Sequence, residues 1–447
     1  MSNIFQKIAC EVELISNTRV EGRVSAVSGI LIEAEGIEKM VSIGSRCSIK
    51  SRFDAPIFAE VIGIRGQTTL LMPFQQTAGV GSGAKVEVLA TDQSVYPHQD
   101  WLGRVINAFG EPIDGKGPLP KGTVAYHLHA NPIQAHMRKR IGPKINMGVR
   151  AINTFLSCCL GQRMGIFSGS GVGKSMMIAM MTKFASTDIK VIGLIGERGR
   201  EVQEFIEDYL GPDGLAKAIV VVATSDESAL TRKQAAYLTM TLCEYYRDIG
   251  LEVLCLMDSV TRFATAQREI GLAAGEPPTT KGYTPSVFSE LPKLLERAGP
   301  GSIDTASITA LFSVLVEGDD QNEPIADAVR GILDGHIILD RDIAARGIYP
   351  AIDVLRSISR TMPRCNNSYE NALVTKARSL LSLYNDMADM IRIGVYKKGS
   401  DKALDEAIQC NDALNKFISQ AYNEPETIDS SYKKLTEAIN FKMPLKS

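Results

Sequence analysis

The stretch RMGIFSGSGVGKSMMIAMM, residues 163–181, decides the fold of the central part of this chain. A short apolar run, Met164 to Phe167, leads into a glycine-rich segment, Ser168 to Gly173, which we expect to form a turn. Lys174 and Ser175 then open an apolar segment with helical periodicity. A strand, a glycine-rich turn and a helix in this order form a phosphate-binding loop.

The residues of this loop each have a chemical reason to be there. Glycine lets the backbone curl so that successive N–H groups point at phosphate oxygens, and the following helix adds the positive end of its dipole. Lys174 can reach the β- and γ-phosphates, and the Ser175 hydroxyl can ligate Mg²⁺. Ser168 replaces the first glycine of the usual eight-residue pattern, at a position that makes the turn but donates no essential group. The residues predicted to bind Mg-ATP are Gly169, Gly171, Val172, Gly173, Lys174 and Ser175.

Length and composition are typical of a globular protein of two or three domains, with 447 residues, 45% apolar and 22% charged. A net charge of -2 gives no electrostatic reason to expect nucleic acid or an acidic membrane surface as a partner. The eight cysteines include no CxxC pair, and Cys158 and Cys159 are adjacent, so we expect free thiols. No run approaches ~18 apolar residues, and the N-terminus shows no signal peptide pattern, so we expect no membrane span and no leader.

The pattern of the chain changes four times along its length. Ile4 to Ile15 has helical apolar spacing and is predicted to form a short amphipathic arm, packed on its own domain or offered to a partner. Residues 21–89 contain short β-rich runs broken by glycine, as in a small β-barrel, and residues 91–143 are rich in Gly and Pro, as in a connector. Apolar runs then alternate with helical patterns, which predicts a parallel sheet with helices on both faces, and residues 368–441 are helical.

Acidic residues follow two of the predicted strands, where a parallel sheet binds its ligands. Asp258 closes the run LEVLCLMD and is a candidate ligand of Mg²⁺ or of its water shell. Glu197 follows KVIGLIG, where a carboxylate would orient and deprotonate a water for attack on the γ-phosphate. Arg198 is placed to contact that phosphate or to fix Glu197, and Glu201, one turn onward, to reach the metal through water.

Several motifs together resemble the catalytic subunits of rotary ATPases, and most of all the ATPases of type III export systems. The motifs GRVINAFGEPIDGKGPLP and IRIGVYKKGSD resemble the flagellar protein-export ATPases in particular, and the likeness covers nearly the whole chain from about Glu21. The other motifs, in chain order, are SGSGVGKS, GERGREV, LMDSVTRFATAQREIGLAAGEPP, KGYTPSVFSELPKLLERAG, VEGDDQNEPIADAVRGILDGHIILDR and GIYPAIDVLRSISR.

The resemblance implies a three-part α/β subunit. Its parts would be an N-terminal arm and β-barrel over residues 1–90, a RecA-like nucleotide-binding ATPase domain over 91–363 and a C-terminal helical domain over 364–447. Such subunits assemble as hexamers around a central channel, with a nucleotide at each interface.

The resemblance also implies roles for particular residues. Lys174 and Ser175 would hold the phosphates and Mg²⁺. Glu197 would be the catalytic carboxylate and Arg198 a neighbour of the γ-phosphate. Asp258 would be the second acid motif, Tyr349 the aromatic residue beside the adenine, and Arg360 the arginine finger of the neighbouring subunit. In the F-type ring the catalytic glutamate and the finger lie on two kinds of subunit. This chain carries both, so a complete site can form between identical copies, and we expect a homohexamer.

Four functions are open to a chain with these motifs. The first is an ATPase that energises flagellar protein export at the cytoplasmic face of the membrane export gate, with stator, regulator and central-stalk proteins, export substrates and chaperones as partners. The second is the virulence-type (injectisome) ATPase, which shares the catalytic motifs. A third, a non-catalytic nucleotide-binding subunit, does not need Glu197. The fourth, a hexameric nucleic-acid translocase, is disfavoured by the net charge of -2 and by the lack of a basic stretch interleaved with aromatic residues.

Overall fold

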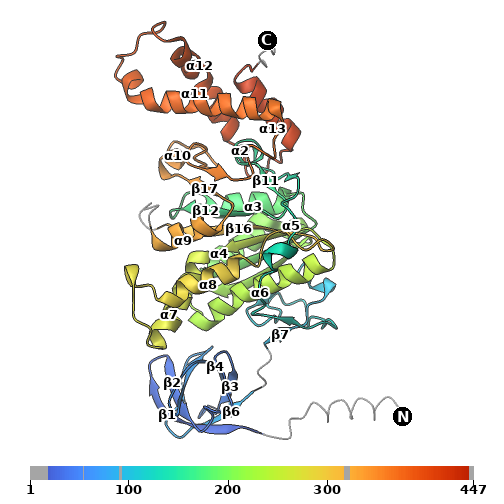
Figure 1. Cartoon of the computed structure of the whole chain (residues 1–447), viewed down its shortest axis with the longest axis vertical. Helices are drawn as coiled ribbons and strands as arrows, with labels where there is room; N and C mark the ends of the chain where they lie inside the picture. The colour runs from blue at the N-terminus through green and yellow to red at the C-terminus, as the bar shows by residue number, and fades with distance from the viewer. Residues whose placement is uncertain (1–18, 54, 90–92, 317–322, 442–447) are drawn as a thin grey trace, which may run out of the picture.

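The computed structural model describes residues 19–53, 55–89, 93–316 and 323–441. A β-barrel, an α/β domain and a group of helices follow one another along the long axis of the molecule (Figure 1). This arrangement confirms the expected fold class. The arm expected over Ile4 to Ile15 lies outside the described residues.

The N-terminal part is a closed barrel of six antiparallel strands. Alternate apolar side chains fill its interior, among them Val24, Ile32 and Val86. The strands are β1 (Glu21–Ser28), β2 (Leu31–Glu35), β3 (Arg46–Ile49), β4 (Ile57–Arg65), β5 (Thr68–Pro73) and β6 (Lys85–Val88). They pair in the order β1-β2-β5-β4-β3-β6, and β6 closes the barrel on β1.

The central part is built on an eight-stranded sheet. Its strands are β8 (Val105–Asn107), β12 (Arg163–Ser168), β13 (Ile189–Glu197), β14 (Ala218–Thr224), β15 (Val253–Asp258), β16 (Ile308–Leu315), β17 (Gly335–Leu339) and β18 (Ile358–Ser359). The spatial order is β18-β17-β12-β16-β15-β13-β14-β8, with β18 antiparallel to β17 and the other neighbours parallel. Two short ladders accompany it, β7 (Ser94–Val95) with β9 (Tyr126–His127) and β10 (Lys144–Ile145) with β11 (Cys158–Cys159).

Residues 91–143 do more than connect the barrel to the sheet. They contribute β8, which pairs with β14 at the sheet edge through Val105 and Val220. The connector is braced internally by Arg104, whose Nε and Nη2 donate to the two carboxylate oxygens of Asp114 at 2.7 and 2.9 Å. The expected connector therefore extends the sheet by one strand.

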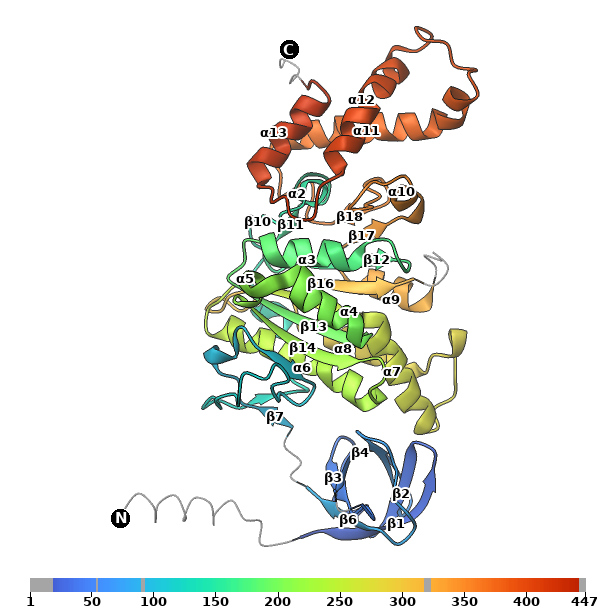
Figure 2. The ribbon, with the colours of Figure 1, turned by 180° about the vertical axis from the view of Figure 1, so that it is seen from behind.

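Helices cover both faces of the sheet, as the alternation of strands and helices predicted (Figure 2). Successive residues of β14 pack into different cores, Val220 and Val222 into one and Ile219 and Val221 into the other. The first face carries α3 (Lys174–Phe184), α4 (Gly199–Glu204), a π-helical turn (Phe205–Leu210) and α5 (Gly211–Leu215). The second carries α6 (Ala229–Asp248), α7 (Val260–Ala273), α8 (Pro285–Leu295) and α9 (Pro324–Ile332). Shorter pieces are α2 (Arg150–Phe155), α10 (Arg341–Ala345) and the 3₁₀ turns Gln99–Trp101, Ala135–Met137 and Thr280–Gly282.

The C-terminal part is helical, as predicted, and consists of α11 (Ser368–Arg392), α12 (Lys402–Ile418) and α13 (Ile428–Ala438). Asn367 caps α11 and forms a capping box with Glu370. The helices share a core with α2 and α3, and buried Arg150 of α2 donates to the Phe417 carbonyl at 2.9 Å and to Glu424 at 2.7 Å. Within the described ranges, no helix combines the length and the apolar character needed to cross a bilayer.

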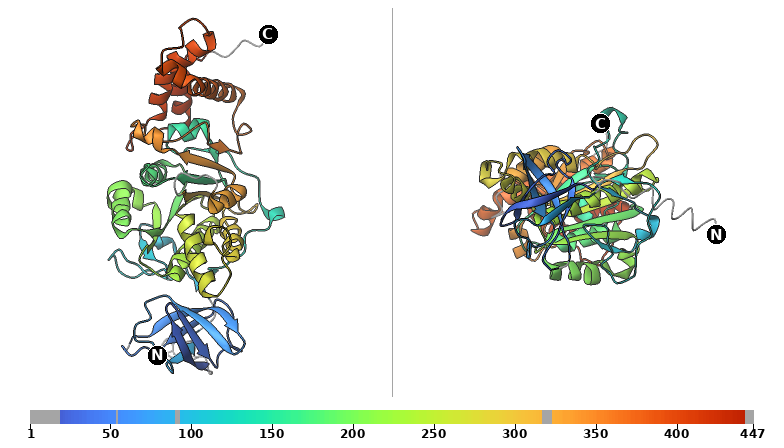
Figure 3. Two further views of the ribbon diagram at one scale, coloured as in Figure 1. Left: turned by 90° about the vertical axis from the view of Figure 1, so that its left-hand side faces the viewer. Right: turned by 90° about the horizontal axis from the view of Figure 1, so that it is seen from below.

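The barrel is joined to the central domain at the opposite end of the molecule (Figure 3). Apolar residues of β4 and β5, such as Leu70 and Met72, pack on Leu230 and Ile270 of α6 and α7. Arg46 of β3 donates to the Gln234 side chain at 2.7 Å. The central domain is thus held at both ends by packed contacts.

Arg297, which follows α8, forms a buried ion pair with Glu244 of α6. Arg297 is 2% exposed, and its Nε and Nη2 donate to the two carboxylate oxygens of Glu244 at 2.8 and 2.6 Å. We expect Arg297→Ala to lower the free energy of unfolding by ~3–5 kcal/mol, because it leaves the Glu244 charge buried and unpaired. Lys293→Ala on α8, which removes the pair between an exposed ammonium group and Glu290, is expected to cost at most ~1 kcal/mol.

Guanidinium unfolding followed by the fluorescence of the single tryptophan, the buried Trp101, measures both variants. Equal unfolding midpoints for Arg297→Ala and Lys293→Ala would contradict the account of this pair.

Candidate functional site

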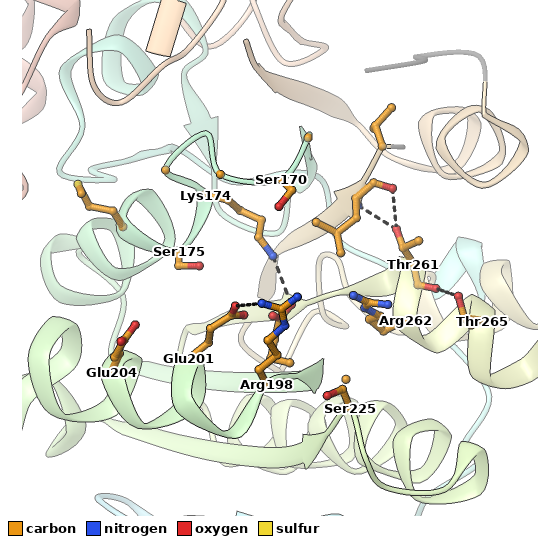
Figure 4. Close-up of a pocket in the computed structure, with 18 of the residues that line it drawn as sticks. Ser170, Lys174, Ser175, Arg198, Glu201, Glu204, Ser225, Thr261, Arg262 and Thr265 are labelled. Carbon is orange, nitrogen blue, oxygen red and sulfur yellow. Dashed lines mark hydrogen bonds and ion pairs between the residues drawn. The ribbon is translucent and has the colours of Figure 1, made fainter. Parts of the chain in front are cut away.

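A cavity of about 800 Å³ opens at the carboxyl ends of the central strands. Figure 4 shows Lys174 and Ser175 on one side of it, Arg198 and Glu201 on another, and Thr261 and Arg262 on a third. Its lining comes from the phosphate loop, the ends of β13, β14 and β16, and helices α4 and α7. The lining residues are Gly169, Ser170, Gly171, Gly173, Lys174, Ser175, Met176, Gly196, Glu197, Arg198, Glu201, Glu204, Tyr209, Ser225, Thr261, Arg262, Thr265, Arg268, Tyr283, Leu315, Val316 and Arg341.

The glycine-rich segment folds as a loop between β12 and α3, with one difference from the prediction. Ser168 is the last residue of β12, paired with Leu315 and Leu339 and fully buried, so the turn begins at Gly169. Because Ser168 stands in the sheet, where its backbone needs no glycine geometry, the missing first glycine does not disturb the loop. Val172, also predicted to bind nucleotide, is buried, and its side chain does not line the cavity.

Gly173 caps α3 and meets two requirements for glycine at once. Its φ of +85° is left-handed, and a Cβ there would lie 3.2 Å from the Tyr349 ring. The aromatic ring predicted to lie beside the adenine therefore packs against the end of the phosphate loop. Tyr349 is 37% exposed, and its carbonyl accepts from the Gln420 N–H at 2.7 Å, which links it to the C-terminal part.

Lys174 points from the start of α3 to the two strand-end acids. Its ammonium group forms ion pairs with Asp258 and, at 3.4 Å, with Glu197. Burial alone would lower the pKa of Lys174, but the charges of Asp258 and Glu197 outweigh it and raise the pKa. The Asp258 carboxylate also accepts from the Ser313 hydroxyl at 2.5 Å. The structure thus brings together a phosphate-binding lysine and two carboxylates, with the lysine charged.

Glu197 reaches the cavity because β13 is irregular at its end. The register with β14 shifts between Ile195 and Glu197, and Gly196 between them has a φ of +72°. A Cβ on Gly196 would lie 2.9 Å from the Arg262 side chain, so glycine also permits the close approach of α7. This bulge re-aims the Glu197 side chain from the sheet face into the cavity.

The surroundings of Glu197 favour a carboxylate that gains and releases protons near neutral pH. Burial and the nearby charges of Asp258 and Glu201 raise the pKa of Glu197 to about 7, although the Lys174 charge opposes the rise. Arg198 is 82% exposed and pairs with Glu201 at 3.8 Å. Arg198 therefore lines the cavity with its side chain largely in solvent and does not fix Glu197 directly.

The first turns of α7 supply residues that the sequence reasoning missed. Ser259 caps this helix, and Thr261, Arg262, Thr265 and Arg268 line the cavity. The sequence did indicate these residues, because α7 follows Asp258 in the chain and its first turn must therefore lie at the same edge of the sheet. Arg262 and Arg268 add two cationic side chains to those of Lys174 and Arg198.

Arg360 lies away from this cavity. It follows β18, and its N–H donates to the carbonyl of Asp334, whose side chain accepts from the Arg163 N–H at the start of β12. The phosphate loop leaves the other end of β12, six residues onward and thus ~20 Å away at ~3.3 Å per residue. The exposed Arg360 guanidinium donates to the Arg330 carbonyl at 3.4 Å. Within one chain, the predicted finger and the predicted site are separated.

Three family descriptions match consecutive parts of the chain. Residues 24–89 match the ATP synthase alpha/beta family, beta-barrel domain, and residues 148–359 match the nucleotide-binding domain of the same family. Residues 368–437 match the T3SS EscN ATPase C-terminal domain. The matches follow the barrel, the sheet and the C-terminal helices described above.

Similar proteins cover nearly the whole chain. The flagellum-specific ATP synthase of Caulobacter vibrioides is 55% identical over 439 residues, which are 97% of this chain and 99% of that protein. The assembled ATPase EscN of the enteropathogenic E. coli type III secretion system has a TM-score of 0.88 and 40% identity, over 94% of this chain and 100% of that one. EscN in complex with its central stalk EscO gives a TM-score of 0.85 and 39% identity, with the same shares covered.

Proposed function

This chain belongs to the ATP synthase alpha/beta family and, within it, to the ATPases of type III export systems, and on that premise we propose that it hydrolyses Mg-ATP to energise flagellar protein export. One observation carries the proposal. The cavity places Glu197 opposite a phosphate-binding loop, in a chain that ends in the export-type helical domain. Hydrolysis is the reaction that this site can perform, and the helical domain indicates what the reaction drives.

The nucleotide would bind along the loop and the start of α3. Backbone N–H groups of residues 169–173 would hold the phosphate oxygens, Lys174 would neutralise the β- and γ-phosphates, and Tyr349 would face the adenine. The pair between Lys174 and Asp258 keeps the ammonium group charged before the nucleotide arrives. Phosphate oxygens would then compete with the carboxylates for the same cation.

The oxygen groups near Lys174 suit Mg²⁺. The Ser175 hydroxyl, the Asp258 carboxylate and, through water, Glu201 are hard ligands, and Mg²⁺ in such sites is held by few side chains together with substrate phosphates. No cluster of three or more His, Cys, Asp or Glu side chains suited to a metal occurs in the described ranges, which is consistent with a metal brought by the nucleotide. When bound, the ion would supply charge neutralisation to the phosphates.

Glu197 would activate the attacking water. Its partly buried carboxylate, with a pKa raised to about 7, is a suitable acceptor for the proton of a water lined up with the γ-phosphate. Arg198, free to move because its side chain is largely solvated, would turn from Glu201 to the transferred phosphoryl group. Charge stabilisation of the transition state would be completed by a second arginine from outside the chain.

We infer that this second arginine is Arg360 of the next subunit in a homohexamer. Its distance from its own cavity and its exposure on the edge of the sheet support a role in trans. The assembled state of EscN, which is 40% identical, supports the same arrangement. Because one chain carries both Glu197 and Arg360, each interface would hold a full site.

This arrangement predicts that nucleotide promotes assembly. A ligand that binds the assembled state more tightly than the monomer shifts the equilibrium towards the ring, by ~2.7 kcal/mol per site when present at ~100 times its Kd. We expect light scattering to show a higher mass with Mg²⁺ and a non-hydrolysable ATP analogue than without them. An unchanged mass at high protein concentration would count against a shared site.

The partners follow from the same family membership. We propose that the ring works in the cytoplasm, peripheral to the membrane at the export gate, and receives export substrates and chaperones together with stator and regulator proteins. The complex of EscN with EscO supports a central-stalk protein as a further partner.

The choice of flagellar over injectisome export rests on the 55% identity to the flagellum-specific ATP synthase of Caulobacter vibrioides, and the type 3 secretion system ATPase of Xanthomonas euvesicatoria, at 45%, keeps injectisome export as the alternative. Deleting the gene and comparing export of flagellar subunits with export of effectors tests this choice, and loss of effector export alone would reverse the assignment.

Mg-dependent ATP turnover by the purified chain tests the enzyme itself, since a non-catalytic subunit would bind ATP without turnover. A binding assay with single-stranded RNA and DNA distinguishes an export ATPase from the nucleic-acid translocase alternative.

A further inference from the structure

Strand β16 is an apolar run that contains buried hydroxyl groups. Its sequence is ITALFSVL, and both Thr309 and Ser313 are fully buried among the apolar side chains. A hydroxyl in a buried strand costs free energy unless it finds a hydrogen-bond partner. The Thr309 hydroxyl accepts from the Gly161 N–H at 3.0 Å, near the start of the strand. Ser313, near the other end of the strand, has a partner of a different kind.

The Ser313 hydroxyl donates to Oδ1 of Asp258 at 2.5 Å. The register of the parallel strands β15 and β16 places the two residues side by side. The end of β16 is also tied to α7, the helix that follows Asp258, because the Thr261 hydroxyl accepts from the Leu315 N–H at 2.9 Å. A carboxylate that accepts from a hydroxyl fixed in the sheet cannot turn freely, so Ser313 sets the orientation of the Asp258 side chain.

Lys174 donates to the same oxygen of Asp258. No donor to the other oxygen, Oδ2, occurs among the residues that the structure describes. In the proposed function, ATP would draw the Lys174 ammonium group towards the phosphates. Ser313 does not line the cavity, so its hydroxyl would keep its bond to Asp258 when the nucleotide is bound. Ser313 is therefore the donor that can hold this carboxylate in the loaded site.

We propose that Ser313 is a positioning residue for the metal, which holds Asp258 by Oδ1 and so presents Oδ2 to the Mg²⁺ of the bound nucleotide or to its water shell. The proposal rests on the proposed function, in which Asp258 and Ser175 serve that ion. Metal ligands are commonly oriented by a hydrogen bond from a neighbouring group, and loss of such a partner costs ~10–100-fold in metal affinity or activity.

Ser313→Ala removes this hydrogen bond and is expected to fold. The Asp258 carboxylate keeps its ion pair with Lys174, so no buried charge is left alone, and alanine fits the space of serine. Ser307→Ala is the matched control, because Ser307 is also buried and stands one residue before β16, at the edge of the sheet away from the phosphate loop. The same change there removes a hydroxyl without touching Asp258.

The test measures the affinity of the full chain for a fluorescent, non-hydrolysable ATP analogue, once with Mg²⁺ and once with EDTA. By linkage, the ratio of the two affinities reports the contacts that the metal makes with the protein. We expect this ratio to fall ~10-fold in Ser313→Ala, with the affinity in EDTA unchanged because the phosphate loop is intact. The ratio in Ser307→Ala is expected to equal that of the wild type.

Turnover gives a second readout. At saturating ATP, the free Mg²⁺ concentration for half-maximal turnover is expected to rise ~10-fold in Ser313→Ala and to stay the same in Ser307→Ala. A merely structural hydroxyl would not move this concentration. An unchanged affinity ratio in Ser313→Ala, or an equal loss of affinity with Mg²⁺ and with EDTA, would overturn the inference. A wild type that gains no affinity from Mg²⁺ and does not turn over ATP would instead contradict the proposed hydrolase, and with it the metal that Ser313 serves.

Discussion

Glu197→Gln is expected to retain ATP affinity and to lose ~10²–10⁴-fold in turnover, because it removes the base that activates water and leaves the phosphate loop in place. Lys174→Ala is expected to lose ATP affinity and turnover together, because the lysine charge neutralises the phosphates in the ground state and in the transition state alike. Fluorescent-nucleotide binding and a phosphate-release assay measure the two properties separately.

A matched control lies on the same segment of the chain. Glu207 is exposed, stands outside the cavity lining and accepts from Gln203 at 3.2 Å. Glu207→Gln removes the same charge two turns beyond Glu201 and is expected to hydrolyse ATP like the wild type. Near-normal turnover in Glu197→Gln would show that another group activates the water.

The second large effect is expected for Arg360→Ala, with a loss of ~10³–10⁵-fold in turnover, the range of an arginine that stabilises the transferred phosphoryl group. ATP affinity of the monomer is expected to stay the same, because Arg360 stands beside the start of β12 and the loop leaves its other end. Arg356→Ala is the control, an exposed arginine of the same segment that pairs with Asp340 at 3.2 Å. A similar small loss in both variants would make Arg360 an ordinary surface charge.

Much of the fold could be predicted from local sequence patterns. The loop motif sets the order of strand and helix, and each strand of a parallel sheet buried on both faces is a continuous apolar run, as in β14. Because parallel strands end at one edge, Asp258 and Glu197 could be placed together before any coordinates were known.

Other features depend on contacts that sequence patterns do not encode. β8 has three residues and is a strand only because β14 offers it a free edge. The bulge at Gly196 depends on the packing of α7 against the end of β13. The separation of Arg360 from its own cavity follows from the antiparallel pairing of β18 with β17, which only the assembled sheet reveals.

Mixing Glu197→Gln with Arg360→Ala tests the central claim, that one site is built from two identical subunits. Each variant alone is expected to be nearly inactive. In mixed rings, an Arg360→Ala copy offers its intact Glu197 to the intact Arg360 of a Glu197→Gln neighbour, at about one interface in four for random assembly. Turnover is therefore expected to rise well above that of either variant and to vanish on dilution, when rings dissociate. A mixture no more active than its two components, under conditions where light scattering shows rings, would contradict the shared site.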